Sequence, residues 1–355
     1  PAGGALAVGQ TLVVYEPERV HVVRPGETLA GIARRESVTT LSLYQNNYFL
    51  GGQPDILPDE ELIVALKGEK SGTLAVNGYA YPFIGQALLR TVLPYMTYLT
   101  PFTYGITAAG GLVIPDDGWM RAAAAEYQAR LWMHLSTLTA EGRFDSRLGG
   151  ALLENEAAQA ALIDAIAANM AEKGYQGLDV DFEFVYPEDA SAYAAFIARM
   201  RESLSPLGLP VFVALVPKTS ANQRGDLYEG HDYRLLGEAA DFVFLMTYEW
   251  GYTYGPPMAV APLRNVELVV DYALSEIPAE KIWMGIPNYG YDWPLPFRQG
   301  DRAQSISNQE AVSLAVQNRV AIRFDQAAQS PWFRYVDGQG REHEVWFEDP
   351  RSIRA

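Results

Sequence analysis

The stretch YQGLDVDFEFV, residues 175–185, alternates acidic and apolar side chains. Successive side chains of a β-strand point to opposite faces, so Asp179, Asp181 and Glu183 share one face, with about 6.5–7 Å between neighbours. The opposite face is apolar and suits packing against helices: Leu178, Val180, Phe182 and Phe184. The pattern predicts a buried strand whose acidic face points into the centre of the fold.

From about Thr73 onward, short apolar strands alternate with helices. Strands are expected at 78–82, 95–105, 129–137, 176–184, 210–217, 241–249 and 281–289. Helices are expected at 117–128, 156–173, 189–204, 232–239 and 265–276. This alternation implies parallel β/α units. Seven units over about 280 residues favour an α/β fold, a (β/α)8 TIM barrel, over an open doubly wound sheet.

The C-terminal part of the chain is not expected to continue the alternation of strands and helices. Residues 318–349 resemble a β-hairpin insertion with a turn at DGQG, 337–340, and PRSIRA, 350–355, resembles the start of a helix. An eighth barrel strand is not recognisable. The last strand is therefore expected to be missing from this chain.

Ahead of the barrel, residues 20–66 form a block with a βααβ pattern. A strand in RVHVVRPGETL, residues 19–29, leads into helices expected at 28–36 and 40–46, and ILPDEELIVAL, residues 56–66, closes the block as a second strand. Residues 1–16 hold a short strand-like tail, VGQTLVVYE, 8–16, that runs into Pro17, and residues 67–72 read as a polar linker.

Composition excludes several classes of function. The net charge of −16 and a pI near 4.7 argue against nucleic acid as a partner. The chain has no cysteine, which excludes disulfides and thiolate catalysis. Apolar runs such as VFVALVP, 211–217, are too short to span a membrane. The four histidines show no ligand spacing, so no metal and no cofactor is expected. The oligomeric state is not predicted.

The three acids admit alternatives. A solvated strand face is one, and a divalent-cation site with oxygen ligands is another, although no second acidic cluster completes a ligand set. General acid catalysis fits better. Glu183 lies nearest the C-terminal end of the strand, where the active sites of barrels lie. Asp181, one step deeper, can hold or exchange a proton, and Asp179 can take up residual charge, leaving an acid with a raised pKa.

The acidic strand resembles the strand-4 signature of glycoside hydrolase family 18, the chitinase-like barrel enzymes. The family pattern is D-G-x-D-x-D-x-E, and QGLDVDFE, 176–183, departs only at Gln176. LMTYEWG, 245–251, resembles the strand-6 segment M-x-Y-D, and GIPNYGYDW, 285–293, resembles the end of strand 7. The resemblance covers 73–355. WMHLSTLTAEG, 132–142, lacks the S-x-G-G that chitinases often carry on strand 3.

The block at 20–66 resembles a LysM module, which binds N-acetylglucosamine-containing glycans. HVVRPGETLAGIARR, 21–35, matches the opening of the module, and QNNYFLGGQPDILPDEELIV, 45–64, matches its close. LAVGQTLVV, 6–14, looks like the last strand of a preceding LysM repeat, so residues 1–16 are expected to be its remnant.

These resemblances imply a substrate-assisted, retaining mechanism. Glu183 is expected to be the acid and base, Asp181 to stabilise the reacting acetamido group, Asp179 to support Asp181, and Tyr248 to orient the acetamido carbonyl. Glu249 stands where the family has Asp and is expected to contact the sugar. Further substrate-binding residues are expected on the loops after strands 6 and 7: Trp250, Asn288, Tyr289, Tyr291 and Trp293. For Trp132 and Trp283, core packing and sugar contact remain open.

The function implied is hydrolysis of β-linked N-acetylglucosamine bonds in peptidoglycan of the spore cortex or cell wall, outside the cytoplasm, with LysM anchoring to the glycan. A chitinase and a catalytically silent lectin of the same fold remain alternatives. The expected partner is a peptidoglycan or chitin-like glycan.

Overall fold

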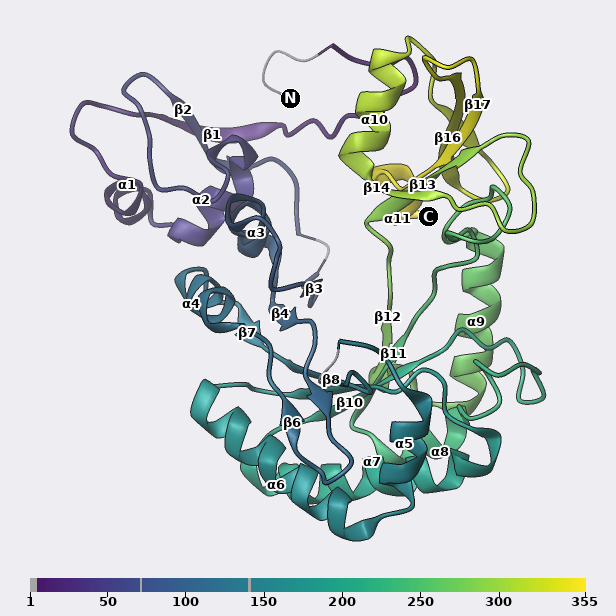
Figure 1. Ribbon diagram of the computed structural model, residues 1–355. Helices are drawn as coiled ribbons and strands as arrows, with labels where there is room; N and C mark the ends of the chain where they lie inside the picture. Colours follow the sequence, from purple (N-terminus) through teal and green to yellow (C-terminus); the bar gives the residue numbers. More distant parts are fainter. Residues whose placement is uncertain (1–4, 71, 140–141) are drawn as a thin grey trace. The chain divides into compact units, whose positions relative to one another are not determined.

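A computed structural model describes residues 5–70, 72–139 and 142–355 (Figure 1). Residues 1–4 of the expected LysM remnant and Ser71 of the expected linker lie outside these ranges. The chain divides into two units. We call residues 14–185 with 192–213 the N-terminal unit, and residues 5–13, 186–191 and 214–355 the C-terminal unit.

The N-terminal unit begins with the expected βααβ block. Its elements are β1 (Pro17–Val22), α1 (Leu29–Glu36), α2 (Thr40–Asn46), the 3-10 turn η1 (Tyr48–Leu50) and β2 (Glu61–Leu66). Strands β1 and β2 pair antiparallel. The hydroxyls of Thr28 and Thr39 cap the two helices by accepting backbone N–H groups of the first turn. Buried Leu29, Leu43 and Leu62 form a small core of its own. The predicted βααβ pattern is confirmed.

The segment ahead of this block differs from its prediction. Residues 5–16 form no strand, so the expected strand at 6–14 is wrong. The backbone turns instead, with Gln10 N donating to Ala7 O over 3.2 Å. Gly9 has a φ of 80°, and a Cβ there would lie 1.9 Å from Ile322 O. The left-handed glycine interrupts the extended run, and Val8 O accepts one hydrogen bond, from Ile322 N, in place of a strand ladder.

Parallel strands follow in the N-terminal unit. Strands β3 (Asn77–Ala80), β4 (Tyr98–Pro101) and β7 (Arg130–Leu131) pair in that order. Strand β8 (Met133–Ser136) pairs with β9 (Leu178–Asp181), and β9 with the first residues of β10 (Val211–Leu215). Trp132 separates β7 from β8, and the two together are the one strand expected at 129–137.

Helices accompany these strands. They are α3 (Gln86–Val92), α4 (Gly118–Glu126), α5 (Ser146–Leu153), α6 (Glu156–Lys173) and α7 (Ala190–Leu204), with short β5 (Gly105–Ile106) and β6 (Leu112–Val113) between them. Three further 3-10 turns lie at η2 (Leu93–Tyr95), η3 (Pro187–Asp189) and η4 (Ser205–Leu207). The long helices α6 and α7 run along one side of the strands (Figure 1).

In the C-terminal unit, β11 (Phe242–Leu245) and β12 (Ile282–Met284) pair in parallel. Helices α8 (Tyr233–Ala239) and α9 (Leu263–Glu276) and the turn η5 (Ala279–Lys281) connect them. All seven expected parallel strands are present, each shorter than predicted.

An antiparallel sheet of order β14-β13-β17-β16-β15 follows. Its strands are β13 (Tyr289–Pro294), β14 (Gln304–Ser307), β15 (Arg323–Asp325), β16 (Ser330–Val336) and β17 (Glu342–Trp346), with α10 (Asn308–Gln317) packed on it and α11 (Pro350–Arg354) at the end. The expected hairpin has an extra strand, because Asp325 Oδ1 accepts the N–H groups of Ala327 and Ala328 and turns the chain after β15. None of the helices in the described ranges combines the length and apolar character needed to cross a bilayer.

Candidate active site

The acidic strand β9 presents its carboxyl groups at different depths. Asp179 is 1% exposed, Asp181 is largely buried, and Glu183 is exposed. The strand ends at Asp181, so the expected burial of Glu183 and of Phe184, which is 52% exposed, is wrong. Leu178, Val180 and Phe182 are buried on the other face, as predicted.

Asp179 is held by a phenol from strand β3, which does not pair with β9. Tyr79 donates its hydroxyl hydrogen to Asp179 Oδ2 over 2.5 Å. Burial raises the pKa of Asp179, the nearby His134 and the Tyr79 hydrogen bond lower it, and the charge of Asp181 raises it, with a net upward shift. The carboxyl group of Asp179 therefore keeps its proton to a higher pH than an exposed aspartate does.

Asp181 is approached from the other side by a histidine of β8. His134 Nε2 lies 3.4 Å from Asp181 Oδ2, and His134 is 1% exposed. Asp181 Oδ1 is buried without a hydrogen-bond partner. In the β8–β9 pair His134 lies opposite Asp179 and Ser136 opposite Asp181, so the His134 ring reaches Asp181 diagonally along the strand. One carboxyl oxygen of Asp181 therefore lies beside the His134 ring, and the other has no hydrogen-bond partner.

Aromatic side chains surround the exposed end of the strand. Burial raises the pKa of Tyr81, and the negative charges of Glu183 and Asp181 raise it further, which places Tyr81 beside both acids. Its ring stacks on Phe83 and meets Phe102 edge-on, each with 4.9 Å between ring centres. Exposed aromatic faces of this kind suit the apolar faces of sugar rings.

The C-terminal unit carries the second group of expected residues, led by Tyr248. Gly285 makes room for its ring: a Cβ on Gly285 would lie 2.7 Å from Tyr248 Cε1 and from Leu245 O. The buried hydroxyl of Thr247 donates to Gly285 O over 2.6 Å. Thr247, which follows β11, and Gly285, which follows β12, thus together fix the position of the Tyr248 ring.

Glu249 is tied to strand β13 of the same unit. Tyr289 and Tyr291 both donate hydroxyl hydrogens to its Oε1, the latter over 2.9 Å. Burial and the Glu249 charge raise the pKa of Tyr289, and the same causes raise that of Tyr291 to about 12. Glu249 adopts a φ of 67°, which is costly for a residue with a side chain. Two phenols thus hold the carboxylate of a residue whose backbone is strained.

Other expected residues separate into exposed and buried ones. Asn288 is exposed and Trp250 is partly exposed. Trp293 is 0% exposed, packs among Val260, Tyr291 and Ala303, and donates Nε1–H to Gly255 O. Its expected sugar contact is therefore corrected to a core role, because β13 points this ring inward. Trp132 is likewise a core residue, stacked between the rings of Tyr98 and Phe212.

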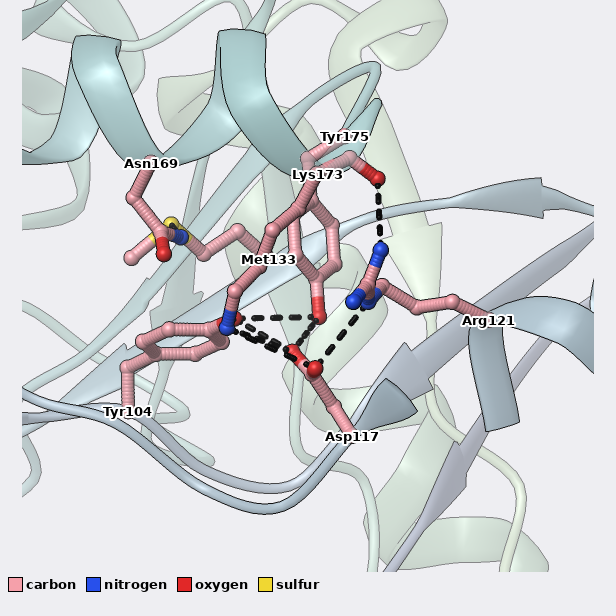
Figure 2. A network of polar contacts seen from close by, with 7 residues as sticks. All are labelled: Tyr104, Asp117, Arg121, Met133, Asn169, Lys173 and Tyr175. Carbon is pink, nitrogen blue, oxygen red and sulfur yellow. Dashed lines mark hydrogen bonds and ion pairs between the residues drawn. The ribbon is translucent and has the colours of Figure 1, made fainter. Parts of the chain in front are cut away.

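A buried polar network stabilises the surroundings of β8 (Figure 2). Asp117 accepts hydrogen bonds from the hydroxyls of Tyr104 and Tyr175, and pairs with Arg121 over 3.0 Å and with Lys173 over 3.4 Å. Burial raises the pKa of Asp117, but these donors and the Lys173 charge outweigh it and hold the pKa below its usual value. No local sequence pattern predicts this network.

Tyr79, Thr103 and His134 were also missed as site residues. The β8–β9 register brings His134 to the acids from 45 residues away in sequence, and strand order brings Tyr79 to Asp179 from 100 residues away. Thr103 joins them through its contact with His134. Within the described ranges, no group of three or more acidic or histidine side chains is arranged to hold a metal ion.

Comparison with known proteins fits this arrangement of acids on an α/β scaffold. Residues 143–355 match the model of glycosyl hydrolases family 18. The chain belongs to this family and has its chitinase-like α/β fold.

Three known proteins illustrate what this chain is similar to in sequence or structure. The chain is 44% identical over 271 residues to the cortical fragment-lytic enzyme of Bacillus subtilis (strain 168), covering 76% of this chain and 63% of that protein. The chain thus spans less than two thirds of that relative's length. The crystal structure of the Bacillus megaterium QM B1551 spore cortex-lytic enzyme SleL matches with a TM-score of 0.80 and 36% identity, over 98% of this chain and 81% of that one. A chitinase from Chromobacterium violaceum ATCC 12472 matches with a TM-score of 0.72 and 26% identity, over 79% of this chain and 88% of that one.

Proposed function

We propose that the chain is a retaining β-N-acetylglucosaminidase that cleaves peptidoglycan of the spore cortex or cell wall, outside the cytoplasm. The observation that carries this proposal is the placement of Asp179, Asp181 and Glu183 from the buried to the exposed end of β9. The exposed carboxyl group of Glu183 can contact a polymeric substrate and still interact electrostatically with the deeper carboxyl groups of Asp181 and Asp179. The cortex as the setting is supported by the similarity to the cortical fragment-lytic enzyme of B. subtilis and to the spore cortex-lytic enzyme of B. megaterium.

The reaction begins when Glu183 donates its proton to the glycosidic oxygen. The carbonyl oxygen of the substrate's 2-acetamido group attacks the anomeric carbon as the leaving group departs, giving a cyclic oxazolinium ion. Glu183, now a carboxylate, takes a proton from water, and that water opens the ring from the face the leaving group occupied. Two inversions at the anomeric carbon give net retention without a carboxylate nucleophile, the exception that this family represents.

Asp181 has a separate role in this scheme. Its carboxyl group accepts the acetamido N–H and stabilises the positive charge that develops on the oxazolinium ring. Asp179, whose pKa is raised by burial and which is held by Tyr79, supports that change of charge one step deeper. Tyr248 donates its hydroxyl to the acetamido carbonyl and orients it for attack, and Glu249, with Trp250, Asn288, Tyr289 and Tyr291, contacts the sugar.

The βααβ block at 20–66 is proposed to act as a LysM module that anchors the enzyme to the glycan. Its fold and its own small core support this role. Tethering raises the local concentration of the catalyst on an insoluble polymer.

Product analysis tests the proposal. The protein is incubated with peptidoglycan, cortex fragments and chitin oligomers, and new reducing ends are identified by mass spectrometry. N-acetylglucosamine reducing ends from peptidoglycan are expected, and the first product formed should be the β-anomer by proton NMR. Cleavage of chitin alone would favour the chitinase alternative, which the Chromobacterium violaceum match supports. Absence of cleavage from all three would favour a lectin.

A further inference from the structure

His134 is a buried titratable group to which the mechanism above gives no task. Both of its ring nitrogens face polar atoms: Nε2 lies 3.4 Å from Asp181 Oδ2, and Nδ1 lies 2.6 Å from Thr103 Oγ1. The flat faces and edges of the ring meet other aromatic rings. Phe102 lies 4.5 Å away and Tyr79 5.6 Å away between ring centres. The imidazole is therefore fixed in orientation as well as in position.

Thr103, the anchor of the ring, is itself held. Its hydroxyl lies 3.0 Å from Ser136 Oγ and 3.0 Å from the carbonyl oxygen of Tyr104. Tyr104 N donates to the backbone oxygen of His134 over 2.9 Å. The phenol of Tyr104 is pinned in turn by Asp117 and Lys173 (Figure 2). A continuous set of buried contacts thus leads from this network to the nitrogen beside Asp181.

The contact with Asp181 is looser than those that anchor the ring. A separation of 3.4 Å exceeds the usual hydrogen-bond length of about 2.7–3.2 Å. Asp181 Oδ1 has no partner at all. A charged or N–H-bearing ring at this distance attracts the carboxylate without locking it, which suits a side chain that must turn.

We propose that His134 is a positioning residue that holds the Asp181 carboxyl group in its resting orientation and stabilises its negative charge until it turns to the acetamido N–H of the substrate. This inference rests on the proposed function of Asp181. It assigns to β8 a task in the reaction that the acidic strand alone does not fulfil. The ring acts through Asp181 and does not touch the substrate.

Three substitutions separate positioning from packing. His134→Gln keeps an N–H near the place of Nε2 and loses the ring. His134→Phe keeps a flat ring against Phe102 and Tyr79 and loses both nitrogens. His134→Asn keeps a polar group near the place of Nδ1, within reach of Thr103, but does not extend to Asp181.

Steady-state kinetics on an N-acetylglucosamine oligomer provide the first readout. For His134→Phe and His134→Asn we expect kcat to fall about 10- to 100-fold, since a charge-assisted contact is lost, while KM changes less than about threefold. His134→Gln should recover kcat to within about fivefold of the wild type. If His134→Phe matches the wild type while His134→Gln is impaired, the ring serves packing and the proposal is wrong.

The pH profile provides the second readout. The titratable groups that face the ring are Asp179 and Asp181 from β9 and Tyr79 from β3. A hydrogen-bond donor beside a carboxylate stabilises its negative charge, so the loss of the donor should be visible in the pH profile. The acidic limb of kcat/KM should move to higher pH in His134→Phe and stay near its wild-type position in His134→Gln. An unmoved limb in His134→Phe would overturn the proposal.

Two controls complete the experiment. His343→Gln removes another histidine beside an aspartate, since His343 Nδ1 lies 2.8 Å from Asp292 Oδ1, and should lower the melting temperature without moving the acidic limb. Glu183→Gln separates this proposal from the proposed function. If Glu183→Gln remains active, the function of the site is wrong; if it is inactive and the His134 variants behave like the wild type, only the positioning role fails.

Discussion

The phenol of Tyr79 reaches from β3 to the deepest acid of β9 and donates a hydrogen bond to Asp179 Oδ2 over 2.5 Å, while Asp179 Oδ1 stays buried without a partner. One oxygen of Asp179 is thus satisfied and the other is not. Ionisation of such a group costs free energy, because its charge is removed from water and only partly compensated.

The pH dependence of stability should report this cost. The folded-state pKa of Asp179 lies above its ordinary value, so its contribution to stability is fully present below the ordinary pKa and is lost as the pH rises from there through the folded pKa. Asp179→Asn removes the ionisation. We expect its melting temperature, relative to the wild type, to increase between pH 4 and pH 8. A relative stability that falls over that range would contradict the assignment.

The Asp117 network predicts the opposite dependence on pH. Its donors hold the pKa of Asp117 below the ordinary value, so its contribution to stability is present above about pH 4 and is lost as the pH falls through the lower folded pKa. Asp117→Asn should reduce the free energy of unfolding at pH 7 by about 3 kcal/mol, because Lys173 and Arg121 lose their buried partner. Urea unfolding at pH 7 and at pH 3 measures this difference, which should shrink at the lower pH.

Gly285→Ala tests whether activity depends on the position of the Tyr248 ring. The added Cβ would lie 2.7 Å from the Tyr248 ring and from Leu245 O, so the ring must move. We expect kcat/KM to fall at least about tenfold, as misplacement near a reacting group commonly does. Gly85→Ala is the matched control, since nothing lies within 4 Å of its Cβ. Equal activities of the two variants would show that activity does not depend on a fixed position of Tyr248.

Glu249→Gln tests the carboxylate that two phenols hold. Its negative charge raises the pKa of Tyr289 and Tyr291, so replacing it with a neutral amide should lower both. Ultraviolet titration of tyrosinate should show two groups ionising at lower pH than in the wild type. Because Gln still accepts a hydrogen bond, activity should fall less than in Glu249→Ala. An unchanged titration would mean that the carboxylate does not face these phenols in solution.

Local patterns were enough to predict the strands and the order of the acids. The alternation of 175–185 predicted the buried face of Leu178 and Val180, and the pattern of residues 20–66 predicted the strands and helices of the βααβ block. These features depend on residues close in sequence. The seven parallel strands follow from the same kind of signal, repeated along the chain.

Contacts across strands could not be predicted in this way. Tyr79 and Asp179 are 100 residues apart, and their meeting depends on strand order and register. His134 looked isolated because its spacing to other histidines is uninformative. Trp293 follows β12 in sequence but lies on β13, whose pairing with β14 and β17 turns the ring into a core. The glycine turn at Gly9 broke a run that composition alone presents as a strand.

Glu183→Gln tests the central claim most directly, with Glu188→Gln, the same change at another exposed glutamate nearby in sequence, as the control. Turnover of a β-linked N-acetylglucosamine oligomer and binding of the same oligomer are measured for both variants. Loss of the general acid should lower kcat of Glu183→Gln about 10²- to 10⁴-fold while the oligomer still binds, and Glu188→Gln should behave like the wild type. A Glu183→Gln variant that retains more than about a tenth of wild-type turnover would contradict the claim.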